Sequence, residues 1–147
     1  VGRRTVECTK TLMVLPLFGV LATQGTAALG QAVTAMYDRA RELAALLRAE
    51  SVFELCHEPD SNIVCFRHRP VGCDPQRVGA LQREIVWRMR EEGSFYCVNA
   101  HVGGAPTMRV SLMNPATERS DLVVLLQTIR GVARRLLAEP GPHRQGP

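Results

Sequence analysis

The chain has 147 residues, of which 46% are hydrophobic, so it is long enough for a domain with a core and too apolar to be intrinsically disordered. The net charge of +4 comes from arginine, because Lys10 is the only lysine. The basic residues form no stripe interleaved with aromatic residues, so we expect no nucleic-acid partner. A small basic cluster comprises Arg130, Arg134, Arg135, His143 and Arg144.

An apolar run over residues 11–22 follows several basic residues, which is the outline of a secretory signal. The run is too short to span a bilayer, and Glu7 and Pro16 are unusual in a signal. We interpret the run as a helix buried in a larger body, bent at Pro16 and Gly19. Export with a cleaved leader remains an alternative, which mass spectrometry would test by asking whether the product starts near residue 28.

A long amphipathic helix is predicted over residues 27–50, after Gly25. Its apolar residues recur at steps of three and four. They are Leu29, Val33, Met36, Tyr37, Ala40, Leu43, Ala44 and Leu47.

From residue 51 the apolar period changes to two, which predicts strands over 52–57 and 62–68. The turn-forming residues between them indicate an antiparallel pair. Asp74 then caps a helix that has Pro75 at its first position and ends at Gly93.

Two further strands are predicted over 95–101 and 108–113, separated by a turn at 103–106. Thr117 can cap a last helix over 118–138, and we expect residues 139–147 to form a disordered tail. Residues 51–138 therefore read β-β-α-β-β-α, which predicts an antiparallel sheet covered by helices on one face.

Arg109 lies in the middle of the fourth predicted strand. Thr107, Arg109 and Ser111 share one face, because side chains alternate along a strand. Two interpretations stay open on this pattern: a solvated arginine on the open face of the sheet, or an arginine whose planar fork binds a carboxylate.

The cysteines are odd in number and form no C-x-x-C motif, which favours a reduced, cytoplasmic protein. They are Cys8, Cys56, Cys65, Cys73 and Cys97. A zinc site from Cys56, His57, Cys65 and His68 can be imagined, but its spacing fits no known ligand pattern, so we predict no metal site.

Six stretches in order carry a resemblance to a known family. They are Arg-Thr-Val-Glu-Cys-Thr-Lys at 4–10, Phe-Glu-Leu at 53–55, Pro-Asp-Ser-Asn-Ile-Val-Cys-Phe-Arg at 59–67, Gly-Ser-Phe-Tyr at 93–96, Met-Arg-Val-Ser-Leu-Met-Asn-Pro-Ala-Thr at 108–117 and Asp-Leu-x-x-Leu-Leu-x-x-Ile at 121–129. Together they resemble the carboxy-terminal part of the group II pyridoxal-phosphate-dependent decarboxylases, which act on glutamate, 2,4-diaminobutyrate, cysteine sulfinate or aromatic amino acids.

The resemblance implies an α/β fold, part of the type I fold of pyridoxal-phosphate enzymes, and a homodimeric intact enzyme. Residues 1–26 would end the large, cofactor-binding domain, residues 27–50 would connect the domains, and residues 51–138 would form the small domain. The family's substrate-carboxylate arginine falls on Arg109. The intact protein would be a cytoplasmic carboxy-lyase with an amino acid substrate and no membrane contact.

The same resemblance implies that this chain lacks the catalytic residues. The family's cofactor-binding lysine follows a histidine upstream of this segment, and Lys10, which no histidine precedes, is not a candidate. We therefore expect pyridoxal 5'-phosphate in the intact enzyme, held by residues outside this chain, and no decarboxylation by this chain alone. It would be a fragment or a truncated product, or alternatively a non-catalytic binding or oligomerisation module. Which amino acid is decarboxylated does not follow from these residues.

Overall fold

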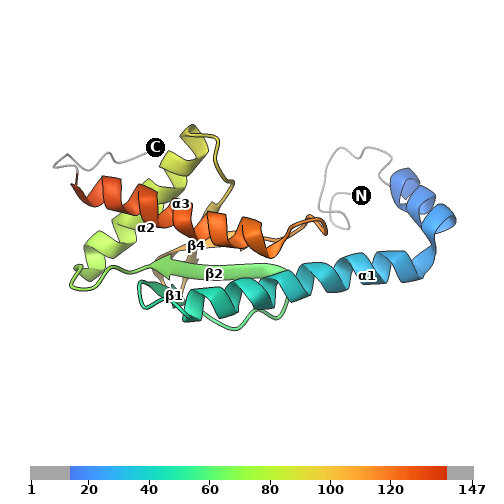
Figure 1. Ribbon diagram of the computed structural model, residues 1–147, viewed down its shortest axis with the longest axis horizontal. Coiled ribbons are helices and arrows are strands. Elements are labelled where there is room, and N and C mark those ends of the chain that lie inside the picture. The colour runs from blue at the N-terminus through green and yellow to red at the C-terminus, as the bar shows by residue number, and fades with distance from the viewer. Residues whose placement is uncertain (1–13, 139–147) are drawn as a thin grey trace, which may run out of the picture. The chain divides into compact units, whose positions relative to one another are not determined.

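The computed structural model describes residues 14–138, which form three helices and one four-stranded sheet in the order α1, β1, β2, α2, β3, β4, α3 (Figure 1). The chain divides into two compact units, residues 1–35 and residues 36–147. The boundary falls inside α1, in the helix that the sequence predicts as a connection. The predicted tail at 139–147 and Lys10 lie outside the described residues.

Helix α1 (Val14–Arg48) is interrupted at Gly25, whose φ of 76° and ψ of 173° are not helical. Glycine adopts such a positive φ without the penalty that a Cβ brings, so the break occurs there. The predicted start of the long helix after Gly25 is thus confirmed, whereas Pro16 and Gly19, where the sequence predicts bends, keep helical φ and ψ angles.

The two parts of α1 differ in burial. In the second unit, Ala40, Leu43 and Leu47 are fully buried. In the first unit, the apolar run near the start of the helix is exposed, with Phe18 64% and Leu15 59% accessible.

The sheet is antiparallel throughout, with strand order β1-β2-β4-β3. Its strands are β1 (Phe53–Leu55), β2 (Ile63–His68), β3 (Val98–Val102) and β4 (Ala105–Ser111). Gly103 and Gly104, both with positive φ, make the two-residue turn between β3 and β4. β3 begins three residues later than the predicted start at 95, and β4 begins three residues earlier than the predicted start at 108.

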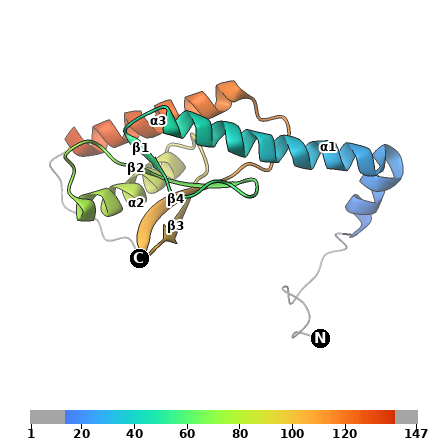
Figure 2. The ribbon, with the colours of Figure 1, turned by 90° about the horizontal axis from the view of Figure 1, so that it is seen from below.

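Helices α2 (Pro75–Glu91) and α3 (Arg119–Ala138) pack together on one face of the sheet (Figure 1). The second unit's part of α1 runs beside α3 (Figure 2), and Arg39 Nε donates a 2.8 Å hydrogen bond to the carbonyl of Thr117. The core lies between the helices and the covered face of the sheet, with Phe66 and Met108 fully buried at its centre. The predicted α/β class and the β-β-α-β-β-α order are confirmed.

Gln82 joins α2 to the end of β2 through buried hydrogen bonds. Its Oε1 accepts from the backbone N–H of His68 at 2.8 Å, and its Nε2 donates to the carbonyl of His68 at 2.8 Å and to that of Val78 at 2.7 Å. Buried backbone groups need partners, and here a side chain takes the place of a neighbouring strand. Gln82 therefore fixes the position of His68 under α2.

The two later helices begin differently. Asp74 caps α2 as predicted, its Oδ1 accepting from the N–H groups of Gln76 (2.8 Å) and Arg77 (3.3 Å). The predicted cap of α3 by Thr117 is wrong, because the helix begins at Arg119 and Glu118 takes the preceding position. There Asp121 reaches back to accept from the Glu118 N–H at 2.9 Å, which is the second half of a capping box.

We expect Asp74→Ala to lower the free energy of unfolding by about 1 kcal/mol, because two N–H groups at the start of α2 lose their acceptor. Urea unfolding followed by circular dichroism would measure the change. Asp60→Ala, at an exposed carboxylate in a turn, is the matched control and should change stability by less than about 0.5 kcal/mol. Equal effects of the two substitutions would contradict the cap.

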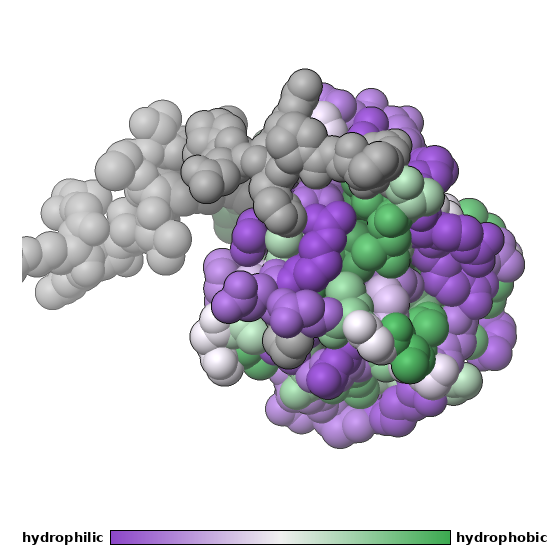
Figure 3. Space-filling view, turned by 90° about the vertical axis from the view of Figure 1, so that its left-hand side faces the viewer, coloured by the Kyte–Doolittle hydropathy of each residue, from purple (hydrophilic) through white to green (hydrophobic). Residues whose placement is uncertain are grey.

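Within residues 14–138, no helix combines the length and the hydropathy needed to cross a bilayer. Figure 3 shows one side of the molecule, where the described atoms in view are mostly hydrophilic and hydrophobic side chains occur in small groups.

Candidate functional site

Arg109 lies in the central part of β4, and its side chain is exposed. The register of the sheet places it between two other residues of the same face: Cys65 of β2 and Val98 of β3 are its Cα partners. The neighbouring residues Met108 and Val110 point the other way and are buried in the core. Alternation along β4 therefore carries the guanidinium to the sheet face opposite α2 and α3, as the sequence predicts.

Two arginines share this open face, and they differ in their partners. Arg67 of β2 forms a 2.7 Å ion pair with Glu54, and it also donates to the carbonyls of Pro106 at 3.2 Å and Val102 at 3.0 Å. The guanidinium of Arg109, by contrast, makes no hydrogen bond or ion pair with any of residues 14–138. The N–H donors of Arg67 form hydrogen bonds within the sheet, whereas the N–H donors of the Arg109 guanidinium are available to an anion.

Two thiols and a hydroxyl group, those of Cys56, Cys65 and Thr107, lie on the same face as Arg109. The Cys56 Sγ lies 3.9 Å from the Thr107 Oγ1. Burial raises the pKa of the Cys65 thiol, the neighbouring Cys56 raises it further, and the positive charge of Arg109 acts in the opposite direction. Burial likewise raises the pKa of Cys56. Both thiols are therefore protonated near neutral pH, so Arg109 has no anionic neighbour that would neutralise it.

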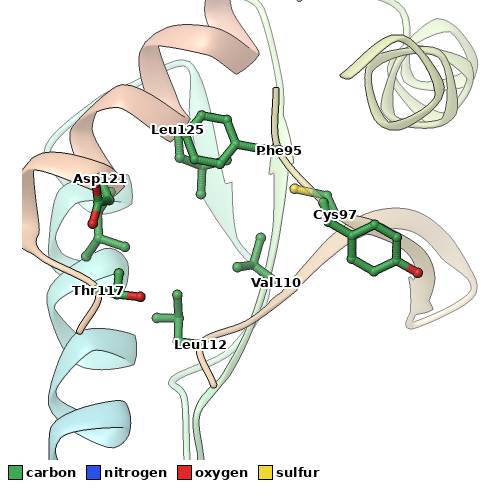
Figure 4. Close-up of a pocket in the computed structure, with 9 residues that line it drawn as sticks. Phe95, Cys97, Val110, Leu112, Thr117, Asp121 and Leu125 are labelled. Carbon is green, nitrogen blue, oxygen red and sulfur yellow. The ribbon is translucent and has the colours of Figure 1, made fainter. Parts of the chain in front are cut away.

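A cavity of about 260 Å³ lies on the other side of the sheet, between β4, the segment before β3 and the start of α3 (Figure 4). It is mostly apolar, with Asp121 and Thr117 on the α3 side (Figure 4), and Phe95 and Leu125 also line it. The remaining lining residues are Tyr96, Cys97, Val110, Leu112 and Leu122. Arg109 does not line it, so the cavity and the arginine are separate features. The sequence pattern did not predict the cavity, because its lining comes from three segments brought together only by folding.

The four side chains of the imagined zinc site are not brought together. His68 lies on the covered face and is 6% exposed, whereas Cys65 lies on the open face. Three residues apart on one strand, the two side chains point to opposite faces. Over residues 14–138, no group of three or more potential metal ligands is found.

The basic cluster near the carboxy terminus is partly neutralised by acidic residues. Arg130 pairs with Glu50 at 2.6 Å, and Arg135 pairs with Glu92 at 2.6 Å. These two arginines of α3 therefore present little free charge to a polyanion.

Solved structures similar to this chain include amino acid decarboxylases. The glutamate decarboxylase domain of diaminobutyrate-pyruvate transaminase and L-2,4-diaminobutyrate decarboxylase from Vibrio parahaemolyticus matches 81% of this chain with 24% identity and a TM-score of 0.75. Mouse CSAD matches 90% with 23% identity and a TM-score of 0.77. Oryza sativa TDC with PLP and tryptamine matches 82% with 22% identity and a TM-score of 0.73. No protein-family model and no curated protein sequence matches the chain.

The chain thus has the fold of a segment of pyridoxal-phosphate-dependent decarboxylase structures. It spans 25% of the Vibrio parahaemolyticus chain, 30% of the mouse chain and 26% of the Oryza sativa chain. The described residues do not fit the cofactor by themselves, because residues 14–138 contain no lysine whose amine could bind the pyridoxal aldehyde covalently. What the described residues provide is an unpaired arginine on an open sheet face.

Proposed function

We propose that this chain is the carboxy-terminal part of a pyridoxal-phosphate-dependent amino acid decarboxylase, in which Arg109 binds the carboxylate of the substrate. The observation that carries the proposal is the absence of any partner for the Arg109 guanidinium among residues 14–138, on a fold shared with such decarboxylases. A solvated arginine on an open strand face is the competing interpretation, and the contrast with the fully paired Arg67 supports binding instead.

The chemistry of this role is positioning. A guanidinium presents parallel N–H donors, so it holds a carboxylate through two charge-assisted hydrogen bonds and fixes its orientation as well as its place. Because Arg109 stands on a central strand with a neighbour on each side, its backbone is rigid, which is what a positioning group requires. Bound in the intact enzyme, pyridoxal phosphate would supply the electron sink for loss of carbon dioxide.

The proposal extends to organisation, partners and cellular location. In the intact enzyme, residues 1–26 would end the large domain, 27–50 would connect the domains, and 51–138 would form the small domain. The intact enzyme would be a homodimer, with the open face of the sheet directed at the rest of the protein. Cytoplasmic location is supported by the free thiols of Cys56, Cys65, Cys73 and Cys97.

A second candidate is a non-catalytic binding or oligomerisation module derived from such an enzyme. The observation that favours it is the lysine content: Lys10 is the only lysine, and no histidine precedes it. In this case Arg109 would still bind an anion, but no bond would be broken.

The reading frame upstream of the codon for Val1 distinguishes the two candidates. A continuous frame that encodes a His-Lys pair supports the decarboxylase, and the encoded protein should release carbon dioxide from an amino acid when supplied with pyridoxal phosphate. A stop codon directly upstream of Val1 would refute the decarboxylase and leave the non-catalytic module.

A further inference from the structure

Cys56 and Cys65 form a cross-strand pair next to Arg109. The pairing of β1 with β2 places Leu55 opposite Phe66, and the register continues by one residue, because the Cys56 N–H donates a 2.9 Å hydrogen bond to the Cys65 carbonyl. Cys65 is also the Cα partner of Arg109. A single row across the sheet therefore runs from Arg109 through Cys65 to Cys56.

The spacing of such a row suits a disulfide. Residues directly opposite each other in an antiparallel sheet have Cα atoms roughly 4.5–5.5 Å apart. Disulfides span Cα separations of about 4.4–6.8 Å, so little backbone movement is needed. The Cys56 thiol lies over the open face, 3.9 Å from the Thr107 hydroxyl, and the register places the Cys65 side chain on the same face.

We propose that Cys56 and Cys65 are a redox-active thiol pair that closes to an intramolecular disulfide by exchange with a low-molecular-weight disulfide. The small fraction of the half-buried Cys56 that is deprotonated attacks one sulfur of that molecule, forms a mixed disulfide and releases the first small thiol. The thiolate of Cys65 then attacks the Cys56 sulfur and releases the second. The two thiol protons end on the two released small thiols, which are the reduced product of the exchange.

The other described cysteines do not have this arrangement. Cys97 is 2% exposed on the covered side, where burial raises its pKa to about 11, and Cys73 lies in the loop before α2. A disulfide between Cys56 and Cys65 would link the end of the short edge strand β1 covalently to β2, in the row of residues that contains Arg109. The inference rests on strand register and is independent of the proposed enzymatic role.

Oxidised glutathione is the probe, applied to the native 147-residue chain. After acid quenching, alkylation of the remaining thiols and trypsin digestion, both cysteines fall in one peptide, residues 49–67, because no arginine or lysine occurs between Arg48 and Arg67. The expected product is this peptide with two hydrogen atoms fewer and no retained glutathione. An unchanged peptide, a stable glutathione adduct, or a dominant link from either cysteine to Cys8, Cys73 or Cys97 would overturn the proposal.

Variants and unfolding provide the controls. Cys65→Ser should retain glutathione on Cys56, because the resolving thiol is gone, whereas Cys73→Ser should close the pair like the parent chain. Unfolding in urea removes the register, so the equilibrium constant for closing should fall by about tenfold or more. An equal constant in the native and the unfolded chain would show that proximity in sequence alone brings the thiols together, which would refute the strand-register argument.

Discussion

Arg109→Ala is expected to lower kcat/KM of the intact decarboxylase by about 100-fold, through a raised KM, a lowered kcat or both. The substitution removes two charge-assisted hydrogen bonds to the substrate carboxylate, each contributing about 1.5 kcal/mol or more. Every 1.4 kcal/mol corresponds to about tenfold in rate or affinity. Steady-state release of carbon dioxide by the protein encoded by the whole reading frame measures the effect.

Fold stability separates a binding role from a structural one. Because the Arg109 side chain makes no hydrogen bond or ion pair within residues 14–138, Arg109→Ala should leave the urea midpoint of the 147-residue chain nearly unchanged. Arg109→Lys keeps the positive charge but loses the planar guanidinium that binds a carboxylate through two parallel hydrogen bonds. Its kcat/KM should therefore fall between those of the parent and the alanine variant. Arg83→Ala, at an exposed arginine of α2, should leave both kinetic constants unchanged. If Arg109→Ala did so too, the carboxylate assignment would be wrong.

The face on which Arg109 lies was predictable, whereas its freedom from partners was not. The alternation of apolar and polar residues over 107–112 fixes which side chains leave the covered face, because a strand has a period of two. The same pattern places Arg67 on the open face. Only the structure shows that the Arg67 guanidinium is bound to Glu54 and to two backbone carbonyls. Pair formation depends on which strand becomes a neighbour, and short-range periodicity carries no such information.

Long-range side-chain contacts account for most of what sequence reasoning missed. The hydrogen bonds of Gln82 to the backbone of His68 link α2 to β2, and no local pattern distinguishes Gln82 from an exposed helical glutamine. The pairing of Cys56 with Cys65 follows from the hairpin register, which strand assignment alone leaves undefined. The third strand also began later than its β-forming residues suggest: Phe95 and Tyr96 line the cavity, and pairing with β4 starts at Val98.

The buried His68 should make the chain sensitive to mild acid. Its side chain is 6% exposed, its Nδ1 has no hydrogen-bond partner, and the Phe53 ring meets it edge-on with centroids 5.2 Å apart. Burial, assisted by the positive charge of Arg130, lowers the pKa of His68 from 6.5 to about 4. Arg130 itself pairs at 2.6 Å with Glu50, which follows the end of α1.

The sign of the effect follows from the direction of the pKa shift. The unfolded chain takes up a proton on His68 below pH 6.5, whereas the folded chain does so only near pH 4, so the stability present above pH 6.5 is lost as the pH falls through this window. Between pH 7.5 and pH 5 the loss from this group should be about 2 kcal/mol. Urea unfolding at both values measures it. His68→Phe should lack this part of the loss, and His101→Gln, at an exposed histidine of β3, should retain it in full. Equal losses in the parent chain and His68→Phe would mean that the imidazole is hydrated in solution and not enclosed under α2.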